Sequence, residues 1–207
     1  MSDQQGMNER AGWEIPQIST RVVTERLALR APRTTDVPEL RRVLRANAAH
    51  LKPWSAAPGP GEDPASLTAV SRAVLRHRRE WKRGQAFVLV ITPRADDKRI
   101  VGRLALGGVL LGAFRNAYLG YWIDCEHQGQ GLMTEAVRAA TELALHTVGL
   151  HRVQAAVMPR NVASQRVLAK VGYRQEGLAA RYLCIAGAWE DHLMFAITRE
   201  EWGAGAG

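Results

Sequence analysis

Two glycines, Gly129 and Gly131, separate an apolar segment at 118–123 from a helically periodic segment that begins at Leu132. Glycine permits a tight turn that leaves backbone N–H groups pointing outward. At a helix N-terminus these groups lack intrahelical partners, and the helix dipole is positive there, so the loop suits a pyrophosphate. A glycine pair alone more often marks only a sharp turn. The nucleotide P-loop and the dinucleotide glycine fingerprint are both excluded by the residues that follow.

The residues around this loop resemble the coenzyme A motif of the GNAT acetyltransferase superfamily, written Gln/Arg-x-x-Gly-x-Gly/Ala. Tyr118-Leu-Gly-Tyr-Trp-Ile123 and Gln128-Gly-Gln-Gly-Leu-Met-Thr-Glu-Ala136 carry the resemblance. Met133 replaces the preferred Gly or Ala, as in the RimJ/RimL-like branch of ribosomal-protein-alanine N-acetyltransferases. Further segments resemble that branch from about Arg21 to Trp202: Thr24-Glu-Arg-Leu27, His50-Leu-Lys-Pro-Trp54, His151-Arg-Val153, Met158-Pro-Arg-Asn-Val-Ala-Ser164, Gly172-Tyr-Arg-Gln-Glu-Gly177 and Trp189-Glu-Asp-His192.

This resemblance implies acetyl-CoA as the co-substrate. It also implies that strand 118–123 diverges from strand 152–157, so that the pantetheine arm lies in the gap and a backbone N–H polarises the thioester carbonyl; an ordinary paired strand is the alternative. Asn161 would bond a pantetheine amide, cap a helix, or do both. The expected co-substrate residues are Tyr121, Trp122, Ile123, Gln128, Gly129, Gln130, Gly131, Leu132, Met133, Thr134, Asn161 and Ser164.

Ser164 is the candidate acid that protonates the leaving CoA thiolate, as the RimL-like branch implies. Many superfamily members use a tyrosine one turn later in the same helix, and Leu168 occupies that position here. A serine in the first turn of a helix is otherwise a cap.

The general base is less directly indicated. The RimL-like branch has a glutamate near the position of Arg181, and this sequence lacks it. Glu135 and Asp191 are the carboxylates to test, with Tyr182 and His192 as weaker candidates. A favourable helix N-terminal charge explains Glu135 equally well, and a fixed polar pair explains Asp191 and His192. A strong base is dispensable for an α-amine of pKa about 7.7–8.0, but not for a lysine near 10.4.

No metal site is expected, because Cys125 and His127 lack a third ligand at a recognised spacing. Two cysteines in a chain of this size favour reduced thiols, and the polar N-terminus lacks the apolar core of a secretory signal. The apolar runs are far shorter than the roughly 20 residues of a membrane span. We therefore expect a cytoplasmic protein that does not contact membranes.

The elements that must position these residues alternate in type. One domain of 207 residues, 46% hydrophobic, is expected at 21–202, with flexible tails at 1–20 and 203–207. The order is mixed α+β, and the resemblance adds a mostly antiparallel sheet splayed at the acetyl-CoA site. The expected strands are 27–30, 86–91, 100–109, 118–123, 152–157, 173–178 and 189–197; helices begin near Asp36, before Arg72, at Leu132 and at Asn161, and 52–64 is a surface loop.

A basic run lies within one expected helix of this chain, whose net charge is +8: Arg72, Arg76, His77, Arg78, Arg79, Lys82 and Arg83. Such runs usually form a solvated helix face, and a ribosome or RNA contact is the alternative. The oligomeric state is expected to be a monomer or a homodimer.

The combined interpretation is transfer of an acetyl group to the N-terminal α-amine of a protein, with a ribosomal protein and a small first residue such as Ala or Ser favoured. Trp54 and Trp122 would wall the acceptor site. A small-amine or antibiotic acetyltransferase is the nearest alternative enzyme, and a non-catalytic module that binds acyl-CoA or RNA is the alternative of another class.

Overall fold

One eight-stranded sheet organises the residues that the computed structural model describes, 12–59 and 61–204. The strand order is β1-β2-β3-β4-β5-β6-β8-β7, and all neighbours are antiparallel except β5 and β6. The predicted mixed, mostly antiparallel fold is confirmed. The strands are β1 (Arg21–Val23), β2 (Leu27–Arg30), β3 (Phe87–Pro93), β4 (Gly102–Leu110), β5 (Asn116–Ile123), β6 (Arg152–Val157), β7 (Arg174–Ile185) and β8 (Ala188–Thr198).

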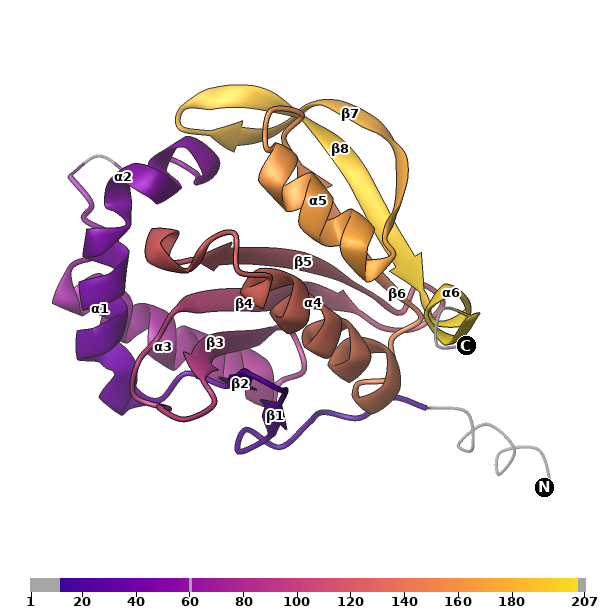
Figure 1. Ribbon diagram of the computed structural model, residues 1–207, viewed down its shortest axis with the longest axis horizontal. Coiled ribbons are helices and arrows are strands. Elements are labelled where there is room, and N and C mark those ends of the chain that lie inside the picture. Colours follow the sequence, from indigo (N-terminus) through magenta and orange to yellow (C-terminus); the bar gives the residue numbers. More distant parts are fainter. Residues whose placement is uncertain (1–11, 60, 205–207) are drawn as a thin grey trace, which may run out of the picture.

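Helices cover both faces of this sheet (Figure 1). One face carries α1 and α3, and the opposite face carries α4 and α5. Among the described residues, no helix is long and apolar enough to cross a membrane. The helices are α1 (Val37–Ala46), α2 (Ala48–Leu51), α3 (Leu67–Lys82), α4 (Leu132–Glu142), α5 (Val162–Val171) and α6 (Arg199–Ala204), with 3₁₀ turns at Lys52–Trp54 and Cys125–His127 and a π-helical turn at Leu143–Thr147.

Local signals explain where the helices begin and end. The Ser66 hydroxyl caps α3 by accepting a hydrogen bond from the Ala69 N–H at 3.2 Å. The Asn161 side chain caps α5 in the same way, at 3.1 Å from the Ser164 nitrogen. Gly172 ends α5 in a left-handed conformation. The helices predicted from apolar periodicity therefore begin and end close to the expected residues.

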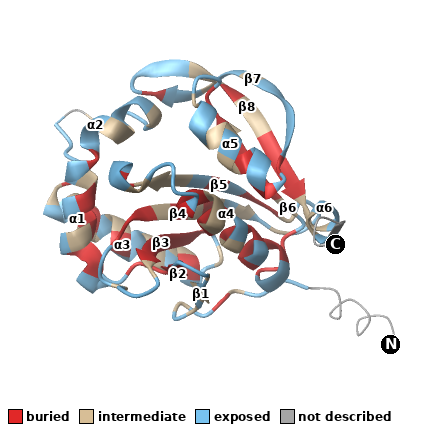
Figure 2. Ribbon diagram, viewed as in Figure 1, coloured by how far each residue is buried: buried red, intermediate tan, exposed pale blue. Residues whose placement is uncertain are grey.

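Two apolar clusters hold the layers together, one on each face of the sheet (Figure 2). In β4, Leu104 and Leu106 are buried in the cluster that contains α4, and the alternate residues Arg103 and Ala105 are only partly buried. Period-two alternation places alternate side chains on opposite faces. The cluster on the other face contains residues of α1, α3 and β3: Val37, Leu40, Val43, Val70, Val74, Val90 and Ile100.

The structure differs from the expected tails in its described part. Residues 1–11 and 205–207 lie outside the description, but the segment from Gly12 to Thr20 packs onto the domain. The Trp81 indole N–H donates to the Pro16 carbonyl at 2.7 Å, and the Glu14 N–H donates to the Val148 carbonyl at 3.0 Å. At the other end, α6 continues to Ala204. These contacts join segments far apart in sequence, so local composition could not reveal them.

The hairpin of β7 and β8 is longer than expected. The prediction ended the first strand at Leu178, whereas β7 continues to Ile185. Its register shifts between Ala179 and Leu183, where the left-handed residue Arg181 faces Asp191 in β8. An irregular strand loses the alternation on which its prediction depends. The short β1 and α2 were also not predicted.

Candidate active site

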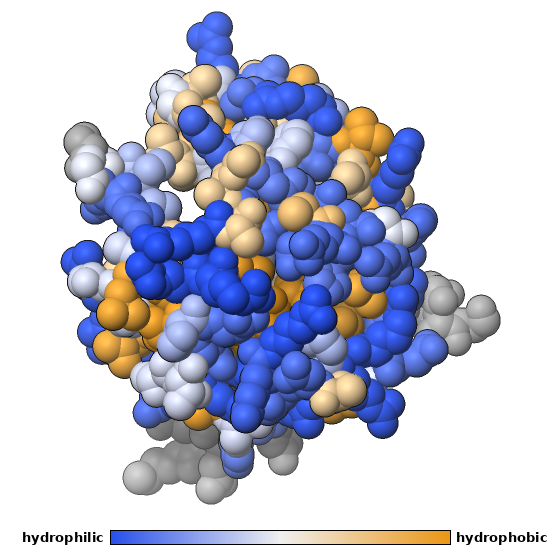
Figure 3. Space-filling view, turned by 60° about the vertical axis from the view of Figure 1, so that its left-hand side comes forward, coloured by the Kyte–Doolittle hydropathy of each residue, from blue (hydrophilic) through white to orange (hydrophobic). Residues whose placement is uncertain are grey.

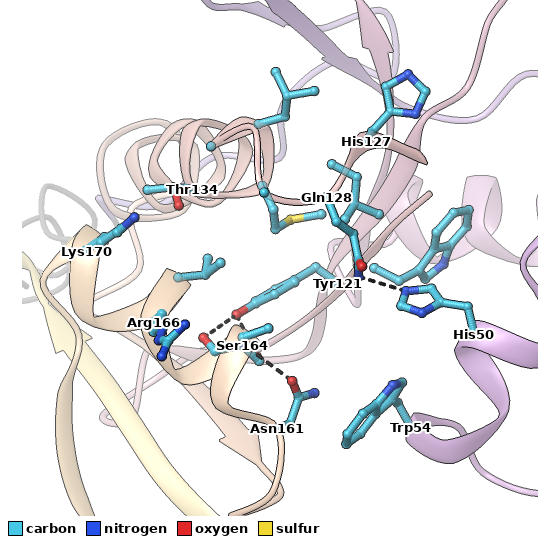
Figure 4. Close-up of a pocket in the computed structure, with 18 of the residues that line it drawn as sticks. His50, Trp54, Tyr121, His127, Gln128, Thr134, Asn161, Ser164, Arg166 and Lys170 are labelled. Carbon is cyan, nitrogen blue, oxygen red and sulfur yellow. Dashed lines mark hydrogen bonds between the residues drawn. The ribbon is translucent and has the colours of Figure 1, made fainter. Parts of the chain in front are cut away.

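A pocket of about 450 Å³ opens between β5, the start of α4, and α5 (Figure 4). Most of the residues predicted to bind a co-substrate line it. Gln130 is the exception: it does not line the pocket, and its backbone and side chain make hydrogen bonds elsewhere. The predicted lining residues are Tyr121, Trp122, Ile123, Gln128, Gly129, Gly131, Leu132, Met133, Thr134, Asn161 and Ser164, and further lining residues are His50, Leu51, Trp54, His127, Ala163, Arg166, Val167 and Lys170.

The pocket exists because two neighbouring strands separate. Among the described strands, β5 pairs with β6 in parallel only as far as Tyr118 and Gln154. Beyond that point β5 remains paired with β4 on its other side, through Ile123. One backbone edge of β5 therefore faces the pocket with its hydrogen-bonding groups available. The expected divergence of these strands is present in the structure.

The glycine loop enters α4 with a backbone that favours glycine. Gly129 and Gly131 have φ angles of 73° and 76°, in the left-handed region, and Gly131 is the N-cap of α4. A Cβ at Gly131 would lie 3.5 Å from Nη2 of Arg26, whereas one at Gly129 would meet no heavy atom within 4 Å. The loop thus presents bare backbone and the positive end of a helix to the pocket, a combination suited to an anion.

An arginine from the β1–β2 turn holds the loop from behind. Arg26 donates from Nη1 to the Gln130 carbonyl at 2.8 Å and from Nε to Glu135 at 2.7 Å. The Arg26 backbone N–H and the Thr24 hydroxyl donate to the other oxygen of Glu135, at 2.9 and 2.6 Å. Burial raises the pKa of Glu135, but these hydrogen bonds and the charge of Arg26 together hold it below its usual value. Glu135 does not line the pocket.

Ser164 and Tyr121 form a hydroxyl pair inside the pocket (Figure 4). Their side-chain oxygens lie 2.8 Å apart, and the Tyr121 hydroxyl also lies 3.2 Å from the Ser164 carbonyl. Burial raises the pKa of Tyr121 to about 12, although the hydrogen bond to Ser164 acts in the opposite direction. Tyr121 therefore stays protonated at neutral pH. The pair can relay a proton at the N-terminal end of α5.

Cationic side chains from α5 line the same pocket. Arg166 and Lys170 are four residues apart, which places them on one face of α5. They were not singled out in the sequence, although the i, i+4 spacing between them, within the helix expected from Asn161, was a usable signal. His50 also lines the pocket, and its Nε2 lies 3.0 Å from the Gln128 side-chain nitrogen.

The other predicted acid–base residues lie outside the pocket lining. Asp191 accepts a hydrogen bond from the Arg181 backbone N–H at 2.7 Å, within the irregular part of the hairpin. Tyr182 contacts His192, with ring centroids 5.6 Å apart. His192 is buried, and its Nδ1 lies 2.9 Å from the Glu190 carbonyl. The contacts given for these three residues thus lie within the hairpin and not with Ser164.

The segment after α2 meets the β7–β8 hairpin near the pocket mouth. The Ala186 N–H donates to the Ser55 carbonyl at 3.0 Å. Arg160 lies 5.8 Å from the centre of the Trp54 ring and pairs with Glu190 at 2.6 Å. Trp54 therefore forms a wall of the pocket next to the contact between these two segments. The sequence predicted it as a wall of the acceptor site.

Comparison with known proteins identifies the family of this chain. The family model described as acetyltransferase (GNAT) domain matches residues 26–174. The chain belongs to the GNAT family. The matched GNAT region contains the glycine loop, the β5–β6 gap and Ser164, and it ends at the first residue of β7. The predictions of family, fold and N-acetyltransferase activity are confirmed.

Three relatives of this GNAT chain refine the comparison. It is 35% identical to the [ribosomal protein uS5]-alanine N-acetyltransferase of Escherichia coli over 193 residues, 92% of this chain and 96% of that protein. It is 47% identical to "Probable N-acetyltransferase YjcK" of Bacillus subtilis over 103 residues, a match that spans 50% of this chain and 57% of that protein. The solved structure of Mycobacterium smegmatis RimJ in complex with CoA-disulfide has a TM-score of 0.78 and 38% identity, covering 84% of this chain and 83% of that one.

The described part of this GNAT domain has no group of three or more His, Cys, Asp or Glu side chains that could hold a metal ion. Cys125 and Cys184 are free and exposed.

Proposed function

We propose that this protein transfers the acetyl group of acetyl-CoA to the N-terminal α-amine of a protein, with ribosomal proteins as the favoured acceptors. The observation that carries the acyl-transfer chemistry is the free edge of β5 between the glycine loop and the Ser164–Tyr121 pair. The acceptor class rests on similarity to the uS5-alanine N-acetyltransferase over 92% of the chain.

The residues present fit acetyl-CoA as the co-substrate. The N–H groups of the glycine loop and the positive end of α4 would receive the pyrophosphate, with Arg166 and Lys170 adding charge from α5. The free edge of β5 would hydrogen-bond the pantetheine amides. The side-chain oxygen of Asn161 caps α5, which leaves the NH₂ group of the same side chain as the donor for a pantetheine oxygen.

Transfer forms a C–N bond between the α-amine and the thioester carbonyl carbon and breaks the C–S bond. A β5 backbone N–H near Trp122 or Ile123 would stabilise charge on the carbonyl oxygen. Ser164 would donate its proton to the departing thiolate and recover one from Tyr121, which is protonated at neutral pH. The proton lost by the amine goes to water, and Tyr121 regains its proton from water, which restores the starting state.

The candidate bases fit other roles better. Glu135 is committed to Arg26 and Thr24 behind the loop, and Asp191 is committed to the hairpin backbone. We propose positioning roles for both. An α-amine needs little help, because about a tenth of it is already neutral at pH 7.

The test is mass spectrometry of ribosomal-protein N-termini from cells with and without the gene. We expect at least one N-terminus with a small first residue to lose its acetyl group when the gene is deleted and to regain it with the wild-type gene. Unchanged N-termini across all ribosomal proteins would overturn the ribosomal assignment. If the purified protein acetylates small amines and no protein N-terminus, the acceptor class is small amines and the proposed class is wrong.

A further inference from the structure

Two arginines and one histidine, which is neutral near pH 7, lie close together on the sheet face opposite α4, near enough for the charges of both arginines to act on the histidine. Arg76 and His77 belong to α3, and Arg103 belongs to β4 on the face covered by that helix. Nη2 of Arg76 lies 3.5 Å from Nε2 of His77. We call Arg76, His77 and Arg103 the α3–β4 cationic cluster. Figure 3 shows that the side of the molecule carrying α1 and α2 is largely hydrophilic, with apolar side chains in small separate areas.

The α3–β4 cationic cluster has almost no compensating negative charge. Within the described residues, its one carboxylate contact joins Arg76 Nε to Glu80 at 3.7 Å, and Arg103 has no ion pair. Burial, followed by the charges of Arg103 and Arg76, lowers the pKa of His77 to about 4. Burial and the charge of Arg76 also lower the pKa of Arg103. A half-buried guanidinium without a partner is costly, and an anionic group would offset that cost.

The cluster adjoins the proposed acceptor site. Arg103 stands directly opposite Trp122 in the β4–β5 ladder. Trp122 lines the pocket and also packs against the apolar cluster of α1 and α3, so it links the two faces of the sheet at the end of β5. Residue Gly120, on the same face of β5 by alternation, is exposed. A chain that leaves the pocket past Trp122 would therefore reach Arg103 within a few residues.

From this placement we propose that the α3–β4 cationic cluster is a subsite for a carboxylate in the acceptor, supplied by an Asp or Glu within the first few residues after the acetylated one. The inference rests on the proposed function and adds a specificity to it. A carboxylate there would accept hydrogen bonds from Arg103 and Arg76 and give the cluster its missing counter-charge. Arg76, one residue of the basic run of α3, thereby gains a role that needs no nucleic acid.

The experiment measures kcat/KM for short peptides that begin with Ala and carry one Glu at position 2, 3, 4 or 5, against a peptide with Gln throughout. We expect at least one Glu peptide to be about three- to tenfold better than the Gln peptide, and this advantage to shrink as salt is raised. Arg103→Gln should abolish the advantage and leave the rate on the Gln peptide nearly unchanged.

Two further variants keep the test decisive. Arg76→Gln changes an exposed side chain of the same cluster and should reduce the advantage even where Arg103→Gln fails to fold. Arg83→Gln, at the far end of α3, is the matched control and should retain it. Equal rates on Glu and Gln peptides in the wild type would overturn this inference alone. Absence of α-amine acetylation on every peptide would overturn the proposed function as well.

Discussion

At the residue scale, the hydroxyl of Ser164 is placed by two separate contacts. Its backbone N–H donates to Asn161, which fixes the first turn of α5, and its side chain lies against the Tyr121 hydroxyl. The first contact is the helix cap that the sequence offered for Asn161, so the cap expected as the alternative role of Ser164 belongs to Asn161. The second gives the side chain a proton source that a cap does not need. The Ser164 hydroxyl is therefore placed for the proton relay, and Asn161 supplies the cap.

Replacing Ser164 with Ala separates these roles. The substitution keeps the backbone N–H that Asn161 caps, so α5 should remain folded. We expect kcat to fall by about 10²–10⁴-fold, the usual contribution of general acid catalysis, with little change in acetyl-CoA affinity. Steady-state kinetics and calorimetric titration measure the two quantities. A wild-type kcat in the folded variant would place the acid elsewhere.

A single substitution also tests the role of Glu135. With Glu135→Gln, the Arg26 clamp loses its charge partner, and we expect KM for acetyl-CoA to rise about three- to tenfold. Acetyl-pantetheine lacks the pyrophosphate that the loop would hold, so its KM should stay nearly unchanged. A fall in kcat with both thioesters, relieved at high pH, would instead identify Glu135 as the base.

At the element scale, the glycine loop and α4 act as one unit because Gly131 is both loop residue and N-cap. The left-handed backbone at Gly131 is a conformation that residues with a side chain rarely adopt. The anion site therefore depends on the local backbone path more than on any single side chain.

Gly131→Val tests this unit. Valine is strained at a φ of 76° and would distort the loop backbone that faces the pocket, so we expect acetyl-CoA binding to weaken by at least about tenfold. Gly112→Val is the matched control: Gly112 has a φ of 71° with open space around it, outside the pocket lining. It should show a similar loss of stability with unchanged binding. Equal binding in the two folded variants would remove Gly131 from the co-substrate site.

Sequence reasoning located the elements whose signals are local. The strand before Gly129 and the helix after Gly131 have clear periods, and both border the pocket as expected. It missed contacts between distant segments, such as Arg26 with Glu135, because nothing in either segment specifies the other. It also placed Asp191 and Tyr182 as site residues, whereas a register shift in the hairpin directs their contacts to the hairpin itself.

At the scale of the whole molecule, the sheet is divided at the β5–β6 gap, and separate apolar clusters secure its two faces. The α3–β4 cationic cluster adjoins one of these clusters, so its charge affects stability as well as binding. His77 is the group in it whose pKa changes most clearly.

Stability should therefore depend on His77 in acid. Its pKa is 6.5 ordinarily and about 4 in the folded protein, so between these values the unfolded chain binds a proton that the folded chain does not. Stability is unaffected above pH 6.5, falls as the pH drops toward 4, and falls no further below that from this group. We expect denaturant unfolding of His77→Gln to lose less stability than wild type between about pH 7.5 and about pH 5. Parallel curves would contradict this assignment.

Transfer to a protein α-amine can be distinguished from transfer to a lysine on a single peptide. Purified protein is given acetyl-CoA and a peptide with a free N-terminal alanine and one internal lysine, and fragmentation mass spectrometry locates the acetyl group. We expect a single acetyl group on the alanine nitrogen, because that amine is far more often neutral near pH 7 than the lysine amine. An acetyl group mainly on the lysine, or an unmodified peptide under conditions in which a small amine is acetylated, would contradict it.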